Sequence, residues 1–194
     1  GSQPFTSALV MSNIEWFKYC WVWEKDKATE HLNANIQPML NYEDIAVFGN
    51  GSIRYFPQID KKPVANIRPV SRRAPTDSYG KYNESADRLI PLGMSFPKRI
   101  LNFYTTNHGE RGYHPTQKPV ALLAYLIRTY TNEGETILDN TMGSGSTIVA
   151  AIQEGRNAIG IERDAEYFAI AQQRCLEATY QPSLFTPQPT QWEP

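Results

Sequence analysis

The chain has 194 residues, of which 41% are hydrophobic, and a formal net charge of -1. These values fit a globular protein with one sizeable core and exclude a disordered tail or a strongly basic packaging protein. Cys20 and Cys175 are too few for a disulfide framework, and no apolar run approaches the length of a membrane span. We therefore expect a cytoplasmic protein without a membrane partner, and the three histidines suggest no metal site.

The first predicted elements lie in residues 1–51, where helix and strand signals alternate. Pro4 can open a short helix that has an apolar side. Tyr19–Trp23 is a dense run of aromatic and β-branched residues and predicts a buried strand. Asp44–Phe48 predicts a second strand, because the turn sequence Gly49-Asn50-Gly51 follows it.

Residues 52–113 show weak periodicity and many prolines, which predicts an irregular insertion with short strands. From Lys61 to Arg99 the segment holds nine Lys or Arg residues and three acidic residues, a local excess of six positive charges. Positive charge beside aromatic side chains suits contact with nucleic-acid phosphates. A solvated loop with incidental charge explains the composition equally well, so the position of the segment in the chain has to decide between them.

From residue 114 onwards the signals become strong. Pro119 marks a helix start, and apolar side chains then follow at helical spacing. The segments ETILD, GSGSTIVAAIQEG and NAIGIERD predict a strand, a helix and a second strand, with Gly155 as the helix C-cap. A last helix is expected over about 164–179.

A loop with two glycines joins the first of these strands to its helix, a geometry that binds nucleotides. Dinucleotides fit poorly, because Ile148 stands where the third fingerprint glycine is needed, and the loop has no phosphate-binding lysine. Asp139 ends the strand, and a carboxylate there repels phosphate but suits a cation. Glu162 ends the second strand about twenty residues later, where an acid can accept hydrogens from both ribose hydroxyls. S-adenosylmethionine has a ribose, a positive charge and no phosphate.

The same residues have a plainer explanation. Asp139 can cap the turn that follows it, while Gly143 and Gly145 can serve tight packing of the strand against the helix. The spacing of both acids around the glycine loop favours S-adenosylmethionine over this alternative. Because only one helix follows Glu162, the other strands of the sheet have to come from the strands predicted in residues 1–51.

Three segments in this order resemble the β-group of DNA amino-methyltransferases: HPTQKP (His114–Pro119), LDNTMGSGST (Leu138–Thr147) and GIERD (Gly160–Asp164). The opening GSQPFTS is similar to the piece that follows the family's catalytic strand. The resemblance implies an α/β, Rossmann-like S-adenosylmethionine-dependent methyltransferase fold with a circularly permuted motif order. It divides the chain into a catalytic-side half of the sheet (1–51), an irregular target-recognition insertion (52–113), a cofactor-binding half (114–180) and a proline-rich tail (181–194).

By the same resemblance, the glycine loop wraps the methionine and sugar of the cofactor, Glu162 holds the ribose, and the HPTQKP segment closes over the methionine end. The implied cofactor-binding residues are Asp139, Asn140, Met142, Gly143, Ser144, Gly145, Glu162, Thr116 and Lys118. The position of the insertion assigns double-stranded DNA to Lys61, Lys62, Arg72, Arg73, Lys98 and Arg99. His114 is expected to cap a turn or lie in a loop rather than to act in catalysis.

The family methylates an exocyclic amino group in DNA, which implies a bacterial or phage restriction–modification setting. In the family, an Asp/Asn/Ser-Pro-Pro-Tyr/Trp segment accepts the hydrogens of this amino group and stacks on the flipped base. The chain has no two consecutive prolines. We therefore assign no catalytic residue and expect the chain to be inactive alone, as the C-terminal part of a longer enzyme, with a natural truncation as the alternative.

Methylation of adenine is the favoured function at this point. Cytosine stays open, because the aromatic residue of the catalytic segment that would distinguish the two bases is absent. A non-catalytic module that binds S-adenosylmethionine or DNA stays open as well, as does an unrelated small-molecule methyltransferase. An NAD-dependent oxidoreductase is excluded by Ile148. A dimer is one option for the oligomeric state, which the sequence does not fix.

Overall fold

The structure, a computed structural model, describes residues 1–61, 93–105 and 112–180. It has two compact units: residues 1–56 together with the chain from residue 99 onwards, and Pro57–Lys98. The predicted tail 181–194 and most of the predicted insertion lie outside the described residues.

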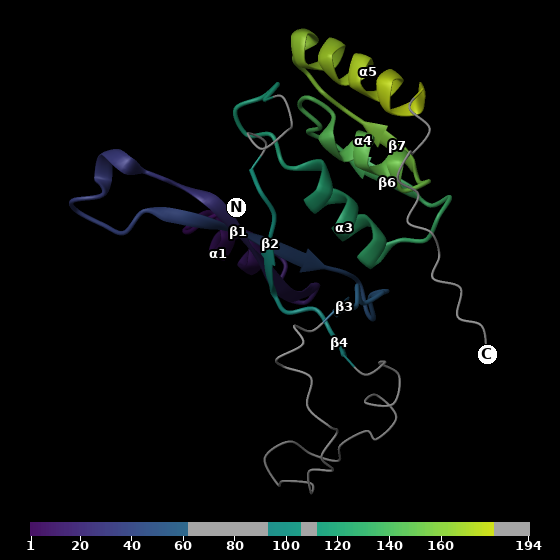
Figure 1. Ribbon diagram of the computed structural model, residues 1–194. Helices are drawn as coiled ribbons and strands as arrows, with labels where there is room; N and C mark the ends of the chain where they lie inside the picture. The colour runs from purple at the N-terminus through teal and green to yellow at the C-terminus, as the bar shows by residue number, and fades with distance from the viewer. Residues whose placement is uncertain (62–92, 106–111, 181–194) are drawn as a thin grey trace, which may run out of the picture. The chain divides into compact units, whose positions relative to one another are not determined.

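The first unit contains a three-stranded sheet in the order β2-β1-β5 (Figure 1). Its strands are β1 (Phe17–Thr29), β2 (Leu40–Phe48) and β5 (Ile100–Asn102), and helix α1 (Phe5–Ser12) precedes them. β1 and β2 are antiparallel and are connected through the short helix η1 (His31–Asn33), whereas β1 and β5 are parallel. The helix after Pro4 and both strands predicted in residues 1–51 are confirmed, and both strands are longer than predicted.

Alternating aromatic side chains of β1 form the core of this sheet. Trp21 and Trp23 are 2% and 3% exposed and pack against helix α3 (Val120–Tyr130). A buried indole N–H needs an acceptor. That of Trp21 donates to the Tyr130 hydroxyl at 2.6 Å, and that of Trp23 donates to the Phe103 carbonyl at 2.9 Å. These contacts fix α3, and with it the HPTQKP segment that precedes it, against the sheet.

The predicted strand, helix and strand are confirmed as β6 (Thr136–Asp139), α4 (Ser146–Gln153) and β7 (Asn157–Gly160). β6 and β7 are parallel neighbours. Helix α4 packs on this pair and on α3 through two fully buried alanines, Ala150 and Ala151. The last helix, α5 (Ala165–Tyr180), packs on α4 (Figure 1). Gly155, which follows α4, has a φ of +69°, the left-handed conformation expected at a helix C-terminus.

The prediction that upstream strands join the sheet of β6 and β7 is not met in the described residues. There β6 and β7 form a two-stranded sheet of their own, separate from β2-β1-β5. Leu138 and Ile159, which alternate with the inward-facing residues, are 63% and 54% exposed. Parallel sheets are normally covered on both faces. The strands β6 and β7 are held in place by packing on α4, which packs on α3, and not by backbone pairing with β1 or β2.

The second unit contains β3 (Asp60–Lys61) and β4 (Met94–Ser95), an antiparallel pair. Two short strands agree with the irregular insertion predicted for residues 52–113, although the unit is narrower than that interval. β5 falls inside the predicted insertion but pairs with β1 in the first unit. Over the part of the chain that the structure describes, no helix is long and apolar enough to cross a membrane.

A carboxylate on β2 links three parts of the first unit. Glu43 accepts from the ammonium groups of Lys25 on β1 at 2.6 Å and of Lys118, just before α3, at 2.8 Å. Burial alone would raise the pKa of Glu43, but the hydrogen bonds and charges of the two lysines outweigh burial and lower the pKa to about 2. The ion pairs therefore help to hold the start of α3 on the sheet.

We predict that Glu43→Gln lowers the free energy of unfolding by about 1–3 kcal/mol at pH 7. The carboxylate stabilises the folded state fully above the ordinary pKa of glutamate, and this stabilisation is lost as the pH falls through about 2. Chemical denaturation at pH 7, 4 and 2 should therefore show the difference between the two proteins shrinking. Glu24→Gln, at an exposed position of β1, is the control and should change the free energy by under about 0.5 kcal/mol. A difference that stays constant down to pH 2 would contradict the prediction.

Candidate functional site

Two carboxylates lie at the carboxyl ends of neighbouring strands. Asp139 is the last residue of β6, and Glu162 follows the end of β7. The backbone joins the two strand ends, because the N–H of Ile161 donates to the Asp139 carbonyl at 2.9 Å and the N–H of Met142 donates to the Ile161 carbonyl at 3.0 Å. The two acids therefore flank the loop of residues 140–145.

Backbone N–H groups fix the side chain of Glu162. Its Oε1 accepts from Asp164 at 2.8 Å, and its Oε2 accepts from Gly143 in the loop at 2.9 Å. These hydrogen bonds, that from Asp164 foremost, hold the pKa of Glu162 below its ordinary value. The carboxylate is thus ionised near neutral pH and has a set orientation, and each of its oxygens can accept a further hydrogen.

Asp139 takes part in a turn. Its Oδ1 accepts the N–H of Thr141 at 3.1 Å, which is the capping role of the plainer explanation. Capping uses one carboxylate oxygen in a single hydrogen bond, so it does not conflict with attraction of a cation by the same group.

Two loop glycines have backbone conformations that other residues rarely adopt. Gly143 has a φ of +53°, and a Cβ there would lie 3.6 Å from the His114 ring. Gly145 has a φ of +80°, and a Cβ there would lie 2.9 Å from the Cβ of Ala171 on α5, too close for a normal contact. The loop is therefore a tight turn pressed between the HPTQKP segment and α5.

The two ends of the HPTQKP segment have different partners. His114 Nδ1 accepts the N–H of Thr116 at 3.1 Å, so His114 caps this turn as predicted, and its ring faces Gly143. Lys118, at the other end of the segment, is directed towards Glu43 on β2. The structure thus brings His114 to the loop, bonds Thr116 to His114 and pairs Lys118 with another strand.

The remaining predicted loop residues differ in their surroundings. Met142 packs on Gly160, where its Sδ takes up the space that a Cβ on the glycine would need. Ser144 is 3% exposed, whereas Asn140 is exposed to solvent. Met142 and Ser144 therefore hold the loop in place, and Asn140 is accessible to a ligand.

Three residues without a predicted role also contact this site. Gln117 Oε1 accepts from the Ser144 hydroxyl at 3.3 Å. Tyr167 meets the His114 ring edge-on, with 4.2 Å between ring centroids, and Arg174 Nη1 donates to the Ser144 carbonyl at 2.6 Å. Tyr167 and Arg174 lie at helical spacing in the last predicted helix, so a search for its inward face could have found them.

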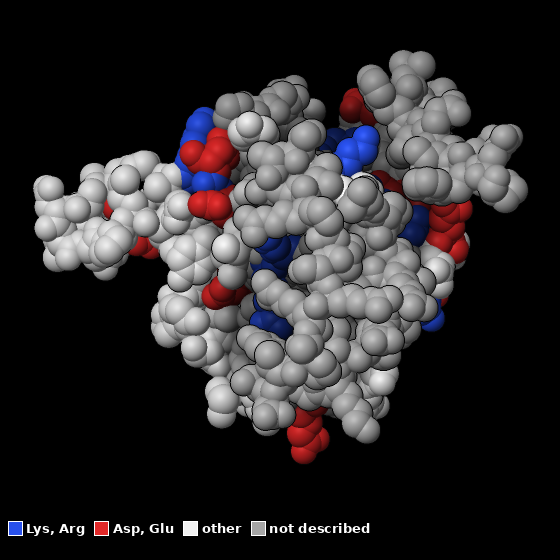
Figure 2. Space-filling view, turned by 60° about the horizontal axis from the view of Figure 1, so that its bottom comes forward, with Lys and Arg blue, Asp and Glu red and all other residues white. Residues whose placement is uncertain are grey.

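Only half of the predicted DNA-contacting residues can be located. Lys61 and Lys98 are exposed, and the exposed Arg99 has its guanidinium 5.4 Å from the Tyr19 ring centroid. The others, Lys62, Arg72 and Arg73, lie outside the described residues. Where described residues face the viewer in Figure 2, some Lys or Arg side chains lie next to Asp or Glu side chains. The three located residues are too few to test the predicted positive surface, which stays a prediction.

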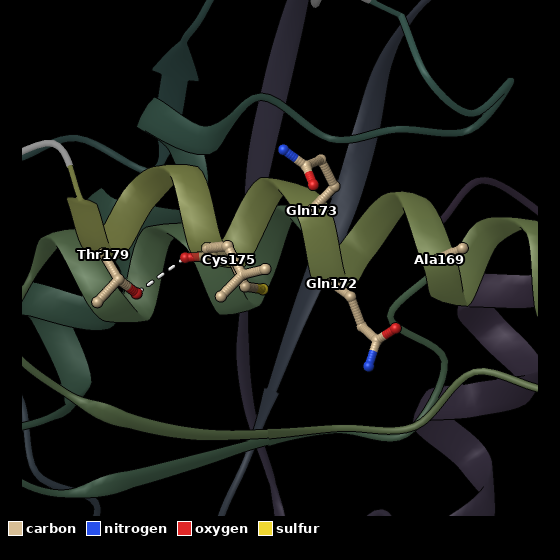
Figure 3. A pocket seen from close by; sticks show the side chains of 6 residues that line it. Ala169, Gln172, Gln173, Cys175 and Thr179 are labelled. Carbon is tan, nitrogen blue, oxygen red and sulfur yellow. Dashed lines mark hydrogen bonds between the residues drawn. The ribbon is translucent and has the colours of Figure 1, made fainter.

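A shallow groove runs along α5 (Figure 3). It is lined by residues of this one helix: Ala169, Gln172, Gln173, Cys175, Leu176 and Thr179. A groove on a single helix cannot enclose a ligand, whereas binding sites for small molecules are concave and bury most of the ligand. We therefore place the candidate site at the carboxyl ends of β6 and β7. Within residues 1–61, 93–105 and 112–180, no three His, Cys, Asp or Glu side chains are arranged to hold a metal ion.

Comparisons with known proteins agree with this geometry. A family model described as "DNA methylase", of the N6/N4 methyltransferase type, matches residues 6–173. YubD of Escherichia coli K12, described as a "putative methylase", is 50% identical over 99 residues, which is 50% of this chain and 44% of that protein. The type II methyltransferase M2.DpnII of Streptococcus pneumoniae is 52% identical over 67 residues, 34% of this chain and 25% of that protein. The chain thus spans less than half the length of these relatives.

Solved structures match over most of the chain. The complex of M1.HpyAVI with S-adenosylmethionine has a TM-score of 0.60 at 24% identity and covers 90% of this chain and 71% of that one. The PvuII DNA methyltransferase, described as cytosine-N4-specific, also has a TM-score of 0.60, at 16% identity, and covers 94% of this chain and 58% of that one. At these identities the likeness shows the fold, which confirms the predicted α/β fold of S-adenosylmethionine-dependent DNA methyltransferases. Because the family model covers most of the residues, including both carboxylates and the glycine loop, the chain belongs to the DNA amino-methyltransferase family.

Proposed function

We propose that this chain forms the cofactor-binding part of an enzyme that transfers a methyl group from S-adenosylmethionine to the exocyclic amino group of adenine in double-stranded DNA. The observation that carries the proposal is the pair Asp139 and Glu162 on either side of a glycine loop, in a chain of this family.

The residues present fit the cofactor. Glu162 is ionised, and the N–H groups of Gly143 and Asp164 orient it, so that it can accept hydrogens from vicinal ribose hydroxyls. Asp139 offers negative charge to a cationic ligand at the other side of the loop, and Gly143 lets the backbone approach closely. When bound, S-adenosylmethionine would supply an electrophilic methyl group on its sulfonium. The residues of this chain would bind and orient that group.

Activation of the amino group requires acceptors for its hydrogens beyond the residues of the candidate site. The lone pair of an exocyclic amine is delocalised into the base, so acceptors for its hydrogens have to raise its nucleophilicity. We propose that an Asp/Asn/Ser-Pro-Pro-Tyr/Trp segment in the remainder of a longer polypeptide does this. The proposal is supported by the comparison with M1.HpyAVI, in which the match covers 90% of this chain but only 71% of that one.

A second candidate is methylation of the cytosine amino group. It is favoured by one observation, the likeness of the fold to the cytosine-N4-specific PvuII enzyme. A non-catalytic module that binds S-adenosylmethionine or DNA is a third candidate. The three differ in the product that the complete polypeptide would form.

We expect Glu162→Gln and Asp139→Asn each to weaken binding of S-adenosylmethionine by about tenfold to a hundredfold, because each removes a charged acceptor. Isothermal titration calorimetry on the folded variants measures this. Glu166→Gln is the matched control: this exposed acid lies in the first turn of α5 and should leave the affinity unchanged. Unchanged affinity in Glu162→Gln and Asp139→Asn would overturn the site assignment.

Incubation of the complete polypeptide with tritiated S-adenosylmethionine and duplex DNA should yield N6-methyladenine on nucleoside analysis, and this chain alone should yield no methylated base. N4-methylcytosine would instead establish the second candidate. Cofactor binding without incorporation by the complete polypeptide would establish the non-catalytic module.

DNA binding should depend on the basic residues of the insertion. Replacement of Lys61, Lys62, Arg72 and Arg73 by Gln should flatten the plot of log affinity against log salt by roughly 0.9 for each phosphate that the variant no longer neutralises. Lys27→Gln on β1 is the control and should leave the slope unchanged. Absence of any salt-dependent binding in the unaltered protein would favour a small-molecule methyltransferase.

A further inference from the structure

One face of helix α5, together with the residue before the helix, contacts four residues of the candidate site. The contacting residues are Asp164 just before the helix, Tyr167, Ala171 and Arg174, which meet Glu162, His114, Gly145 and Ser144 respectively. Their spacing of three, four and three residues places them on one side of the helix. Of the four, only Arg174 carries a positive charge.

Arg174 is buried beside the glycine loop, with 9% of its surface exposed. Its Nη1 donates to the Ser144 carbonyl at 2.6 Å and to the hydroxyls of Ser144 and Ser146 at 3.1 Å each. The guanidinium also lies 4.9 Å from the centroid of the Tyr113 ring. One side chain therefore holds the residues on both sides of Gly145 and reaches the segment before His114.

Helix packing alone does not explain this arrangement. Ser146 is the first residue of α4, and the positive end of the helix dipole disfavours a cation there. Removing a guanidinium from water adds to that cost, and an apolar side chain of similar volume would avoid both. What Arg174 offers instead is a charged donor on a rigid planar group, whose Nη1 contacts a carbonyl and two hydroxyls at once.

The same contacts connect the loop to the HPTQKP segment. The Ser144 hydroxyl held by Arg174 also donates to Gln117 Oε1 at 3.3 Å, and Gln117 Oε1 accepts the N–H of Tyr113 at 2.9 Å. Arg174, Ser144, Gln117 and Tyr113 thus form a closed set of contacts. Within this set the loop and the turn that carries Thr116 cannot shift independently.

We propose that Arg174 is a positioning residue of the cofactor site, which sets the conformation of Gly143–Gly145 through Ser144 and Ser146 and aligns the loop with the HPTQKP turn. This inference rests on the proposed function, because the ligand that benefits is S-adenosylmethionine. Arg174 does not touch the ligand and acts through the backbone of the loop.

The test compares Arg174→Met and Arg174→Lys with the unaltered chain. Calorimetry should show the Kd of S-adenosylmethionine raised by about tenfold to a hundredfold in Arg174→Met, because this variant cannot form the hydrogen bonds of a charged group. Arg174→Lys keeps the charge but not the planar guanidinium. Its Kd should therefore lie between those of the unaltered chain and of Arg174→Met. In NMR spectra recorded without ligand, the amide resonances of Gly143 and Gly145 should shift in both variants relative to the unaltered chain.

Gln173→Met is the matched control. This residue is the exposed neighbour of Arg174 on α5, and its side chain bonds to Glu177 on the same helix. It should leave the Kd within about twofold and the two glycine resonances in place. A lower melting temperature in Arg174→Met with unchanged Kd and unchanged resonances would overturn the proposal, because that result describes a residue that only stabilises the fold.

Two further outcomes are distinguishable. If Arg174→Met does not fold, Arg174→Lys decides by the same two measurements. If the unaltered chain does not bind S-adenosylmethionine, the proposed function fails, while the glycine resonances still show whether Arg174 sets the loop; resonances that stay in place would overturn the positioning role.

Discussion

The hydrogen bond from the Gly143 N–H to the Glu162 carboxylate is the contact on which the candidate site depends. It joins the loop after β6 to the segment after β7, and it can form because Gly143 adopts a positive φ beside the His114 ring. Parallel pairing of the two strands brings Asp139 opposite Gly160, so the second acid has only a short distance of chain to cover. A carboxylate that accepts two backbone N–H groups is both ionised and immobile, which suits recognition of a sugar more than a freely rotating side chain would.

Side-chain packing, rather than backbone pairing, sets where this site lies in the first unit. A two-stranded sheet is marginal by itself, and β6 and β7 gain their support from α4, whose Ala150 and Ala151 allow close approach to α3. Helix α3 in turn packs on Trp21 and Trp23 of the other sheet. One helix therefore relates the two sheets, and the ion pair of Lys118 with Glu43 anchors its start.

The sequence predicted those parts of the molecule whose signals are local. The strand, glycine loop, helix and strand around Asp139 follow from periodicity and turn residues within a short window, and the spacing to Glu162 follows from the same unit. The pairing of β5 with β1 could not be predicted, because a three-residue strand has too little pattern and its partner is remote in sequence. The direction of Lys118 was equally out of reach, since a long side chain can serve either the loop or a carboxylate on another strand, and only the packing of α3 decides. Arg174 was missed because a charged residue in a helix is ordinarily solvated.

Methyl transfer from a sulfonium to an amine is an in-line displacement, so its rate depends on the geometry of the bound donor more than on any group that exchanges a proton with it. A misplacement of about 1 Å can cost roughly a hundredfold in rate. A loop made flexible by glycines suits close backbone approach but is poorly suited to such accuracy. The structure combines the two requirements by surrounding Gly143 and Gly145 with rigid neighbours: the capped turn at His114, the inner face of α5 and the inward-packed side chain of Met142. Under the proposed function, the glycines would permit the approach of the cofactor, and their neighbours would fix its position.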